Sequence, residues 1–194
     1  MGEKGNSHYL ETGLKYQHES YDDDLNEWER IDSAGYSLPY TGSTIVLSQF
    51  LETANRLRNE KVEMYVHNSH ERNVGKGTFK LNTGVRVSHL GLGDEWLVSP
   101  RASLHWRPAH NPRNLSWKLA WGIYQQAAQY REFRNPVGEL NTDLKAQRAQ
   151  HFVAGLDLDF PWSRISKKPF RLIAELYYKK FDRLVSYDVD NVRI

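Results

Sequence analysis

The chain has 194 residues, contains no cysteine, and carries a formal charge of +2 from interspersed acidic and basic side chains. This length suffices for one domain with a sizeable core. The lack of cysteine excludes disulfides, thiolate metal sites and thiol catalysis. No Lys/Arg block indicates a nucleic-acid partner, and no run approaches the roughly 18 uninterrupted apolar residues of a transmembrane helix.

Hydropathy is low while aromatic content is high. Hydrophobic residues make up 39% of the chain, and aromatic residues 12%, with six Trp and eleven Tyr. A sheet that faces lipid with alternate residues only would have this composition. The N-terminal stretch MGEKGNSHYL lacks the apolar core of a signal peptide, so we expect either a cytoplasmic protein or a piece of a longer chain.

The first half of the chain alternates apolar and polar residues in several stretches, which is the pattern of a strand with two different faces. Taken in order, the predicted strands are His8–Glu19, Ser43–Phe50, Arg56–Asn68, Thr78–His89 and Glu95–Arg107. The composition of Thr53–Glu63 also suits a helix, but its apolar residues make no helical face. The last two strands form the clearest predicted hairpin.

Three longer alternating runs follow, over Leu115–Gln126, Ala149–Phe160 and Pro169–Phe181, and Leu184–Ile194 begins a further strand. Each of the three has about nine to eleven residues or more, which is the length of a tilted strand that crosses a bilayer. The sequence therefore predicts an all-β fold. We expect an antiparallel meander of about eight long strands that forms a section of a transmembrane β-barrel.

The connections differ in length. Ser20–Thr41 and Gln129–Arg148 are predicted to be long loops, whereas the short connections are Ser69–Gly77, Gly91–Asp94, Pro108–Asn114 and Pro161–Pro169. Outer-membrane barrels have long extracellular loops and short periplasmic turns. We therefore expect the two long loops to lie outside the cell, and Ser69–Gly77, Pro108–Asn114 and Pro161–Pro169 to face the periplasm.

The polar faces of these strands decide between two architectures. A membrane barrel turns its apolar face to lipid and its polar face to a wet lumen, which would suit six charged residues: Lys80, Arg86, Arg101, Lys118, Asp157 and Glu175. The alternative is a soluble all-β ligand- or carbohydrate-binding module, such as a small barrel or sandwich, with the apolar face turned inward. A hydrolase built on a β scaffold is a third possibility.

No metal or cofactor site is predicted. Asp22, Asp24 and Asn26 have the spacing of the first EF-hand ligands, but Glu27 stands where that loop needs Gly and Ser33 where it needs Glu. A solvated acidic loop is the preferred interpretation. His67 and His70 are three apart, so on a strand they face opposite sides and do not converge on a metal.

Catalysis is not predicted either. Glu27, Glu29 and Asp32 could be imagined as a glycosidase pair, but nothing supplies the rigid scaffold that fixes two carboxyl groups. The nucleophile elbow, the P-loop and the dinucleotide fingerprint are all missing. We therefore expect a protein that is not an enzyme.

The aromatic residues have two interpretations, a sugar-stacking surface or an aromatic girdle at the membrane interfaces. The girdle is preferred, because Trp106, Trp162 and Phe170 flank the short turns. Three aromatic residues instead fall in the predicted Ser20–Thr41 loop, and they are the candidates for ligand contact: Trp28, Tyr36 and Tyr40.

Several ordered segments resemble the C-terminal half of the barrel in TonB-dependent outer-membrane receptors. They are SPRASLHWRP (Ser99–Pro108), the stretch Tyr130–Phe160, and PFRLIAELYYKKFDRLVSYDVDNVRI (Pro169–Ile194). The element Asn141–Gln147 is similar to a loop-to-strand junction of that family, although Ala146 and Gln147 replace the usual Pro and Glu. Asn26–Tyr40 resembles one of its extracellular loops.

The resemblance implies a 22-stranded barrel around an N-terminal plug, which imports a scarce ligand such as an iron chelate, cobalamin or a glycan. The implied partners are the rest of the barrel and the plug, the TonB complex, outer-membrane lipid and the small-molecule ligand. The implied location is the outer membrane of a Gram-negative cell. On this interpretation residues 1–194 are a partial barrel segment without a plug domain.

Overall fold

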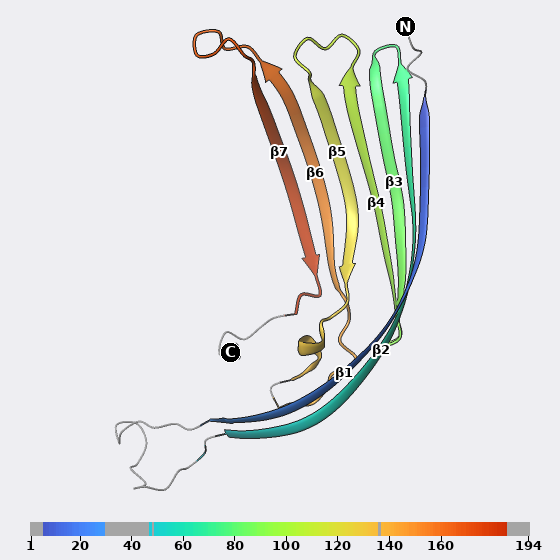
Figure 1. Ribbon diagram of the computed structural model, residues 1–194, viewed down its shortest axis with the longest axis vertical. Helices are drawn as coiled ribbons and strands as arrows, with labels where there is room; N and C mark the ends of the chain where they lie inside the picture. The colour runs from blue at the N-terminus through green and yellow to red at the C-terminus, as the bar shows by residue number, and fades with distance from the viewer. Residues whose placement is uncertain (1–5, 30–46, 48, 136, 186–194) are drawn as a thin grey trace, which may run out of the picture.

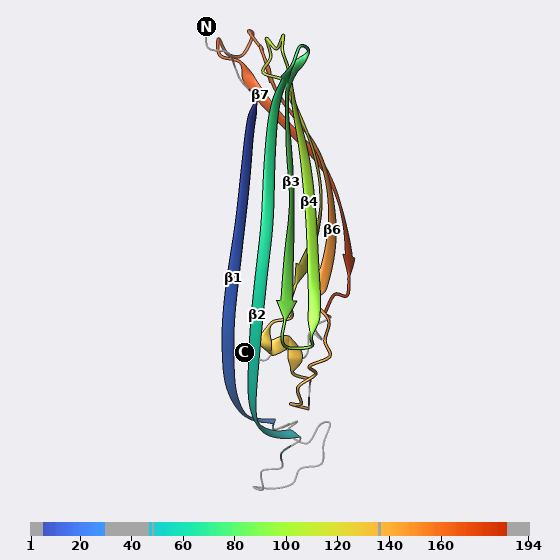
Figure 2. The same cartoon turned by 90° about the vertical axis from the view of Figure 1, so that its right-hand side faces the viewer.

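The computed structural model describes residues 6–29, 47, 49–135 and 137–185, which form a single curled sheet. Seven strands follow one another in chain order, and every neighbouring pair is antiparallel. Their bounds are β1 Ser7–Glu29, β2 Gln49–Val74, β3 Gly77–Leu90, β4 Glu95–Pro108, β5 Ser116–Gln126, β6 Gln147–Phe160 and β7 Phe170–Asp182. The expected all-β antiparallel meander is confirmed (Figures 1 and 2).

The described part of the chain has one helical element, the short 3₁₀ helix η1 (Tyr130–Phe133), which lies between β5 and β6. In the described ranges no helix has the length and apolar character needed to cross a bilayer.

The first two strands are much longer than predicted. The Ser20–Thr41 loop is wrong for residues 20–29, which continue β1 and pair with β2 as far as Glu29 opposite Gln49. Of the predicted strand Ser43–Phe50, Gln49 and Phe50 are in a strand, as the first residues of β2, and Leu47 is not; 43–46 and 48 lie outside the described residues. The strand prediction for Arg56–Asn68 is confirmed, and the ambiguous Thr53–Glu63 stretch is strand.

The connections are shorter than the sequence indicated at both ends of the sheet. The turn predicted over Ser69–Gly77 consists of only Gly75 and Lys76, because β2 extends to Val74 and β3 begins at Gly77. The Gln129–Arg148 loop contains η1, and β6 begins inside it at Gln147. Leu184 and Val185 are not in a strand, and residues 186–194 lie outside the described part. The described strands number seven, against about eight expected.

The short turns lie together, as predicted. The β2–β3, β4–β5 and β6–β7 connections share one end of the sheet, which we call the short-turn end (Figure 1). The β3–β4 and β5–β6 connections share the other end, where β1 ends at Glu29 and β2 begins at Gln49 (Figure 1). There β1 and β2 run past β3, whose pairing with β2 stops at Leu90 opposite Lys61. Residues 18–29 and 49–60 therefore form a two-stranded hairpin extension.

Alternation places the side chains on an apolar and a polar face. The register aligns Leu81, Leu104, Leu119, Ala154 and Leu176 in one row across β3–β7 on the apolar face. This face is open: Leu176 is 76% exposed and Leu14 is 73% exposed. Among the described residues the buried apolar side chains are few: Leu57, Leu90, Leu97, Phe133 and Ala146.

Candidate functional site

The apolar face has the length of a strand that crosses a bilayer. On β6 it runs from Phe152 to Phe160, eight steps of the strand or roughly 26 Å along it. Both limits are marked by aromatic rings. Phe152 lies between Trp121 and Tyr178 at one limit, with ring centroids 6.5 and 6.3 Å away. An apolar band of about 25 Å between aromatic girdles is the outer surface of a membrane barrel.

The limits of this apolar band are staggered from strand to strand across the sheet. At the short-turn end, the last apolar residues of the band on β3, β4 and β5 are Phe79, Trp106 and Trp117, which pair with one another in a single row. The same row continues to Ala174 on β7, but the band on β7 extends to Phe170. The limit of the band is therefore four residues further along β7 than along β3. A shift of about 13 Å along the strands over about 19 Å of sheet corresponds to a strand tilt of about 35°. Barrel strands tilt by this amount.

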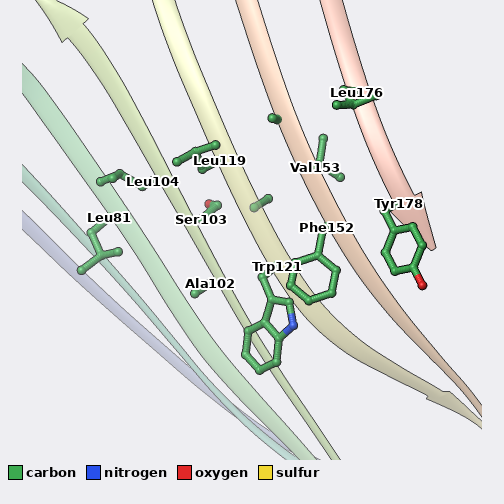
Figure 3. A pocket seen from close by; sticks show the side chains of 12 residues that line it. Leu81, Ala102, Ser103, Leu104, Leu119, Trp121, Phe152, Val153, Leu176 and Tyr178 are labelled. Carbon is green, nitrogen blue, oxygen red and sulfur yellow. The ribbon is translucent and has the colours of Figure 1, made fainter. Parts of the chain in front are cut away.

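The aromatic girdle at the short-turn end was predicted and has formed. Trp106 stacks on Phe79 with centroids 6.0 Å apart, and Phe160, Trp162 and Phe170 contact one another at 5.9 to 6.5 Å. Figure 3 shows side chains from the middle of the band, among them Leu81, Leu104, Leu119 and Leu176, which lie in one row on the apolar face of β3–β7. Rings at this level suit a lipid–water boundary better than a sugar site.

The opposite face is polar. The register places Lys80, Arg86, Arg101, Lys118, Asp157 and Glu175 on it, all six of the charged residues predicted to share a face. Hydroxyl and amide groups link neighbouring strands: Ser69 donates to Asn82 at 2.8 Å, and Asn82 donates to Ser103 at 3.1 Å. Lys118 pairs with Glu175 across β5–β7 at 3.9 Å.

The polar face is the inner face of the curl, because contacts reach across it from distant strands. Arg183, which follows β7, donates to the Glu95 carboxylate at the start of β4 at 3.1 Å. The Ala146 amide donates to the other oxygen of Glu95 at 2.9 Å. Ala146 also packs with Leu90 and Leu97 in a small buried cluster. A wet interior lined by polar side chains follows from this arrangement.

The most developed contacts lie where the β5–β6 connection (residues 127–146) folds back against the hairpin extension. Arg134 Nη1 donates to Asp23 Oδ2 at 3.2 Å, and both side chains are more than three-quarters buried. Asn55 Nδ2 donates to the Gly138 carbonyl at 3.0 Å. The rings of Tyr21 and Tyr130 stack with centroids 5.2 Å apart.

Two backbone features fit the β5–β6 connection to the hairpin. Gly138 has φ +83°, and a Cβ there would clash with the Thr53 side chain, so this close approach needs glycine. At the start of η1, the Gln129 amide donates to Glu132 at 2.7 Å. The Tyr130 hydroxyl is buried without a partner at ordinary hydrogen-bond geometry. Burial, and secondly the Asp23 carboxylate beside it, raise the pKa of Tyr130 to about 12.

The structure describes one of the three candidate ligand-contact residues. Trp28 lies near the end of β1, opposite Phe50, and it is 64% exposed. It is therefore a strand residue at the tip of the hairpin extension and not a loop residue. Tyr36 and Tyr40 lie outside the described residues. The residues that join the hairpin to the β5–β6 connection were not predicted, since Asp23, Asn55, Arg134 and Gly138 are far apart in sequence and carry no motif.

The acidic residues that resembled an EF-hand or a glycosidase pair lie elsewhere than expected. Asp22, Asp24 and Asn26 are in β1, on one face of an extended strand, and Asp22 forms an ion pair with Arg56. Glu27 and Glu29 are also in β1, and Asp32 is outside the described residues. His70 stacks on His8 with centroids 4.1 Å apart, on the opposite face to His67. Among the described residues no group of three or more His, Asp or Glu side chains is placed to hold a metal ion.

Comparisons with known proteins agree with this geometry. No curated protein and no solved structure matches the chain. A family model described as TonB dependent receptor-like, beta-barrel, matches residues 2–194. Because that match takes in nearly the whole sequence, the chain belongs to the TonB-dependent receptor β-barrel family.

Proposed function

We propose that this chain forms part of the wall of an outer-membrane receptor that binds a scarce ligand outside the cell and admits it to the periplasm. The family consists of outer-membrane receptors and transporters rather than enzymes. The observation that carries the proposal is the two-faced sheet, with an apolar band about 26 Å long along the strand on one side and charged side chains on the other.

The work of such a wall is binding and gated passage. The hairpin extension and the β5–β6 connection lie at the end opposite the short turns, which on this proposal is the cell exterior. Trp28, Tyr36 and Tyr40 are proposed to contact the ligand there. Iron chelates, cobalamin and glycans are the candidate ligands, and energy would come from TonB through a plug supplied by the rest of the receptor.

Ligand uptake tests this proposal. Cells that carry the complete receptor containing this chain would be given a labelled ferric chelate, cobalamin or oligosaccharide, in matched strains with and without working TonB. We expect one ligand class to bind in both strains and to accumulate only with TonB. Accumulation that is equal without TonB would sink the transport proposal.

The proposed contact residues need a separate comparison. Trp28→Ala, Tyr36→Ala and Tyr40→Ala should each weaken ligand binding, whereas Trp162→Ala, at the short-turn end, should not. The soluble-module alternative is tested by expression of the chain without detergent. A monomer that stays soluble and unfolds cooperatively would contradict the membrane location, because the exposed apolar face would then need a core that the described residues lack.

A further inference from the structure

The connections at the short-turn end are basic, and the nearest strand carboxylate, Asp159, accepts a hydrogen bond from Asn114. The three connections carry five cations and no carboxylate, and the five are Lys76, Arg113, Arg164, Lys167 and Lys168. All five are exposed, and within the described part of the chain none of them forms an ion pair. The connections described at the other end carry both signs, with Asp94, Glu132, Glu139 and Asp143 beside Arg131, Arg134 and Lys145.

Three of these cations belong to one ordered turn, between β6 and β7. The amides of Ile165 and Ser166 both donate to the Trp162 carbonyl, at 2.9 and 3.1 Å, so the turn has a defined shape. Trp162 and Ile165 are 50% and 62% exposed. A turn that presents Arg164, Lys167 and Lys168 together with exposed apolar residues suits a boundary between lipid head groups and acyl chains.

The apolar face of β3–β7 is hollowed in the middle of the apolar band. Two adjoining hollows of about 450 and 610 Å³ share the side chains of Leu104, Leu119, Ala154 and Leu176. They exist because small residues lie among large ones. Ala154 is aligned between Leu119 and Leu176, and Ala174 is opposite Leu156, with Trp117 in the same row. We call the two hollows together the apolar groove; Figure 3 shows the smaller one.

The groove and the basic turn are separated by the length of an acyl chain. From Ala154 to Phe160 is about six residues of β6, or roughly 20 Å along the strand. With a tilt of about 35° this is about 16 Å along the membrane normal, close to one leaflet of a core about 30 Å thick. The path passes Leu158 and Leu172 and ends at the Phe160–Phe170–Trp162 cluster.

We propose that the basic β6–β7 turn and the apolar groove together form a binding site for an anionic phospholipid. Its phosphate lies among Arg164, Lys167 and Lys168, and one acyl chain lies over Ala174 and Ala154. A free phosphate would leave the groove empty. An acidic peptide would place unpaired backbone groups in an apolar groove, which is costly. An amphiphile with a charged head satisfies both halves of the site.

Native mass spectrometry of the full chain in detergent tests the site. Phosphatidylglycerol and phosphatidylcholine with the same acyl chains would be added to the wild type and to variants of each half. We expect the wild type to retain phosphatidylglycerol at least tenfold better. Arg164→Gln/Lys167→Gln/Lys168→Gln should abolish this preference, since each cation near an anionic surface contributes about fivefold. Ala154→Leu/Ala174→Leu should weaken binding of both lipids.

Matched controls separate the site from general effects. Arg131→Gln/Lys145→Gln removes two cations at the other end, and Thr83→Leu adds bulk to the apolar face of β3 outside the groove; both should bind like the wild type. Circular dichroism of every variant must show the wild-type strand content. Equal retention of the two lipids by the wild type would overturn the proposal. Displacement of phosphatidylglycerol by glycerol phosphate alone would also overturn it, because it would reveal an anion site without an acyl-chain site.

Discussion

The phenol ring of Tyr65 lies over Gly13, its partner across the β1–β2 ladder, on the polar face of the sheet. The ring occupies the space where any other residue would place its Cβ. From there the Tyr65 hydroxyl donates to Glu11 Oε1 at 3.0 Å. A large ring over a strand glycine shields the exposed backbone and fixes the register of the pair.

Gly13→Ala should therefore lower stability, although alanine normally suits a strand better than glycine. The new Cβ displaces the ring and breaks the Tyr65–Glu11 hydrogen bond, at a cost of about 1 kcal/mol. The free energy of unfolding in lipid vesicles, measured with urea, checks this. In a Tyr65→Ser background the same change should be neutral or stabilising. If the two changes simply added, the ring would not depend on the glycine.

Tyr130 should make the docking of the β5–β6 connection sensitive to high pH. Its folded pKa of about 12 lies above the ordinary value of 10.0. The neutral phenol therefore stabilises the docked form fully below pH 10, and this contribution is lost as the pH rises toward 12. Absorbance titration of tyrosine ionisation should show one late-titrating group that is absent in Tyr130→Phe. Disappearance of the late group in Tyr124→Phe instead would contradict the assignment.

The Arg134–Asp23 pair should control local opening of the β5–β6 connection. Both side chains are largely buried, so Asp23→Asn weakens a charge-assisted hydrogen bond at a cost of about 1–2 kcal/mol. Amide hydrogen exchange in residues 130–146 should then rise about tenfold, with little change in β3 and β4. The exchanged pair Asp23→Arg/Arg134→Asp should recover part of the protection. Equal acceleration throughout the sheet would mean that the pair supports the whole fold.

A charged substitution on the apolar face should destabilise the protein most near the middle of the apolar band. Leu176 lies near the middle of the band, so Leu176→Arg should lower the free energy of unfolding in lipid by about 2–4 kcal/mol. The matched control is Ile173→Arg on the polar face of the same strand, where it would lie beside Asp157; it should cost less than about 1 kcal/mol. Equal costs for the two variants would contradict the assignment of faces.

Strand identity was predictable from sequence wherever one face is apolar. Thr78–His89 and Glu95–Arg107 match β3 and β4 to within a residue at each end, because Leu81, Val85, Leu104 and Trp106 alternate with polar neighbours. The two-faced sheet, the shared end of the short turns and the girdle residues follow from the same pattern. The physical cause is the difference between the two environments, which forces alternation on every strand between them.

The prediction failed where that difference vanishes. Residues 20–29 read as a loop because neither face of the hairpin extension is uniformly apolar: Asp22 and Arg56 lie on one side, and on the other Asp23 and Asn55 lie among Tyr21, Leu25 and Leu57. Such strands are held by backbone pairing and by contacts from distant segments, and neither leaves a hydropathy signal. The Arg134–Asp23 and Asn55–Gly138 contacts join positions more than 80 residues apart and were invisible for the same reason.

The length of the hairpin extension has a consequence for what the cell exposes. From Tyr16, where the apolar band on β1 ends, to Glu29 is about 13 residues, or roughly 43 Å of strand contour. The head-group layer outside a hydrocarbon core is only about 6 Å thick on each side. In a membrane-inserted chain the tip with Trp28 and Phe50 therefore stands well clear of the lipid. With the orientation proposed above, an antibody against this tip should bind intact cells.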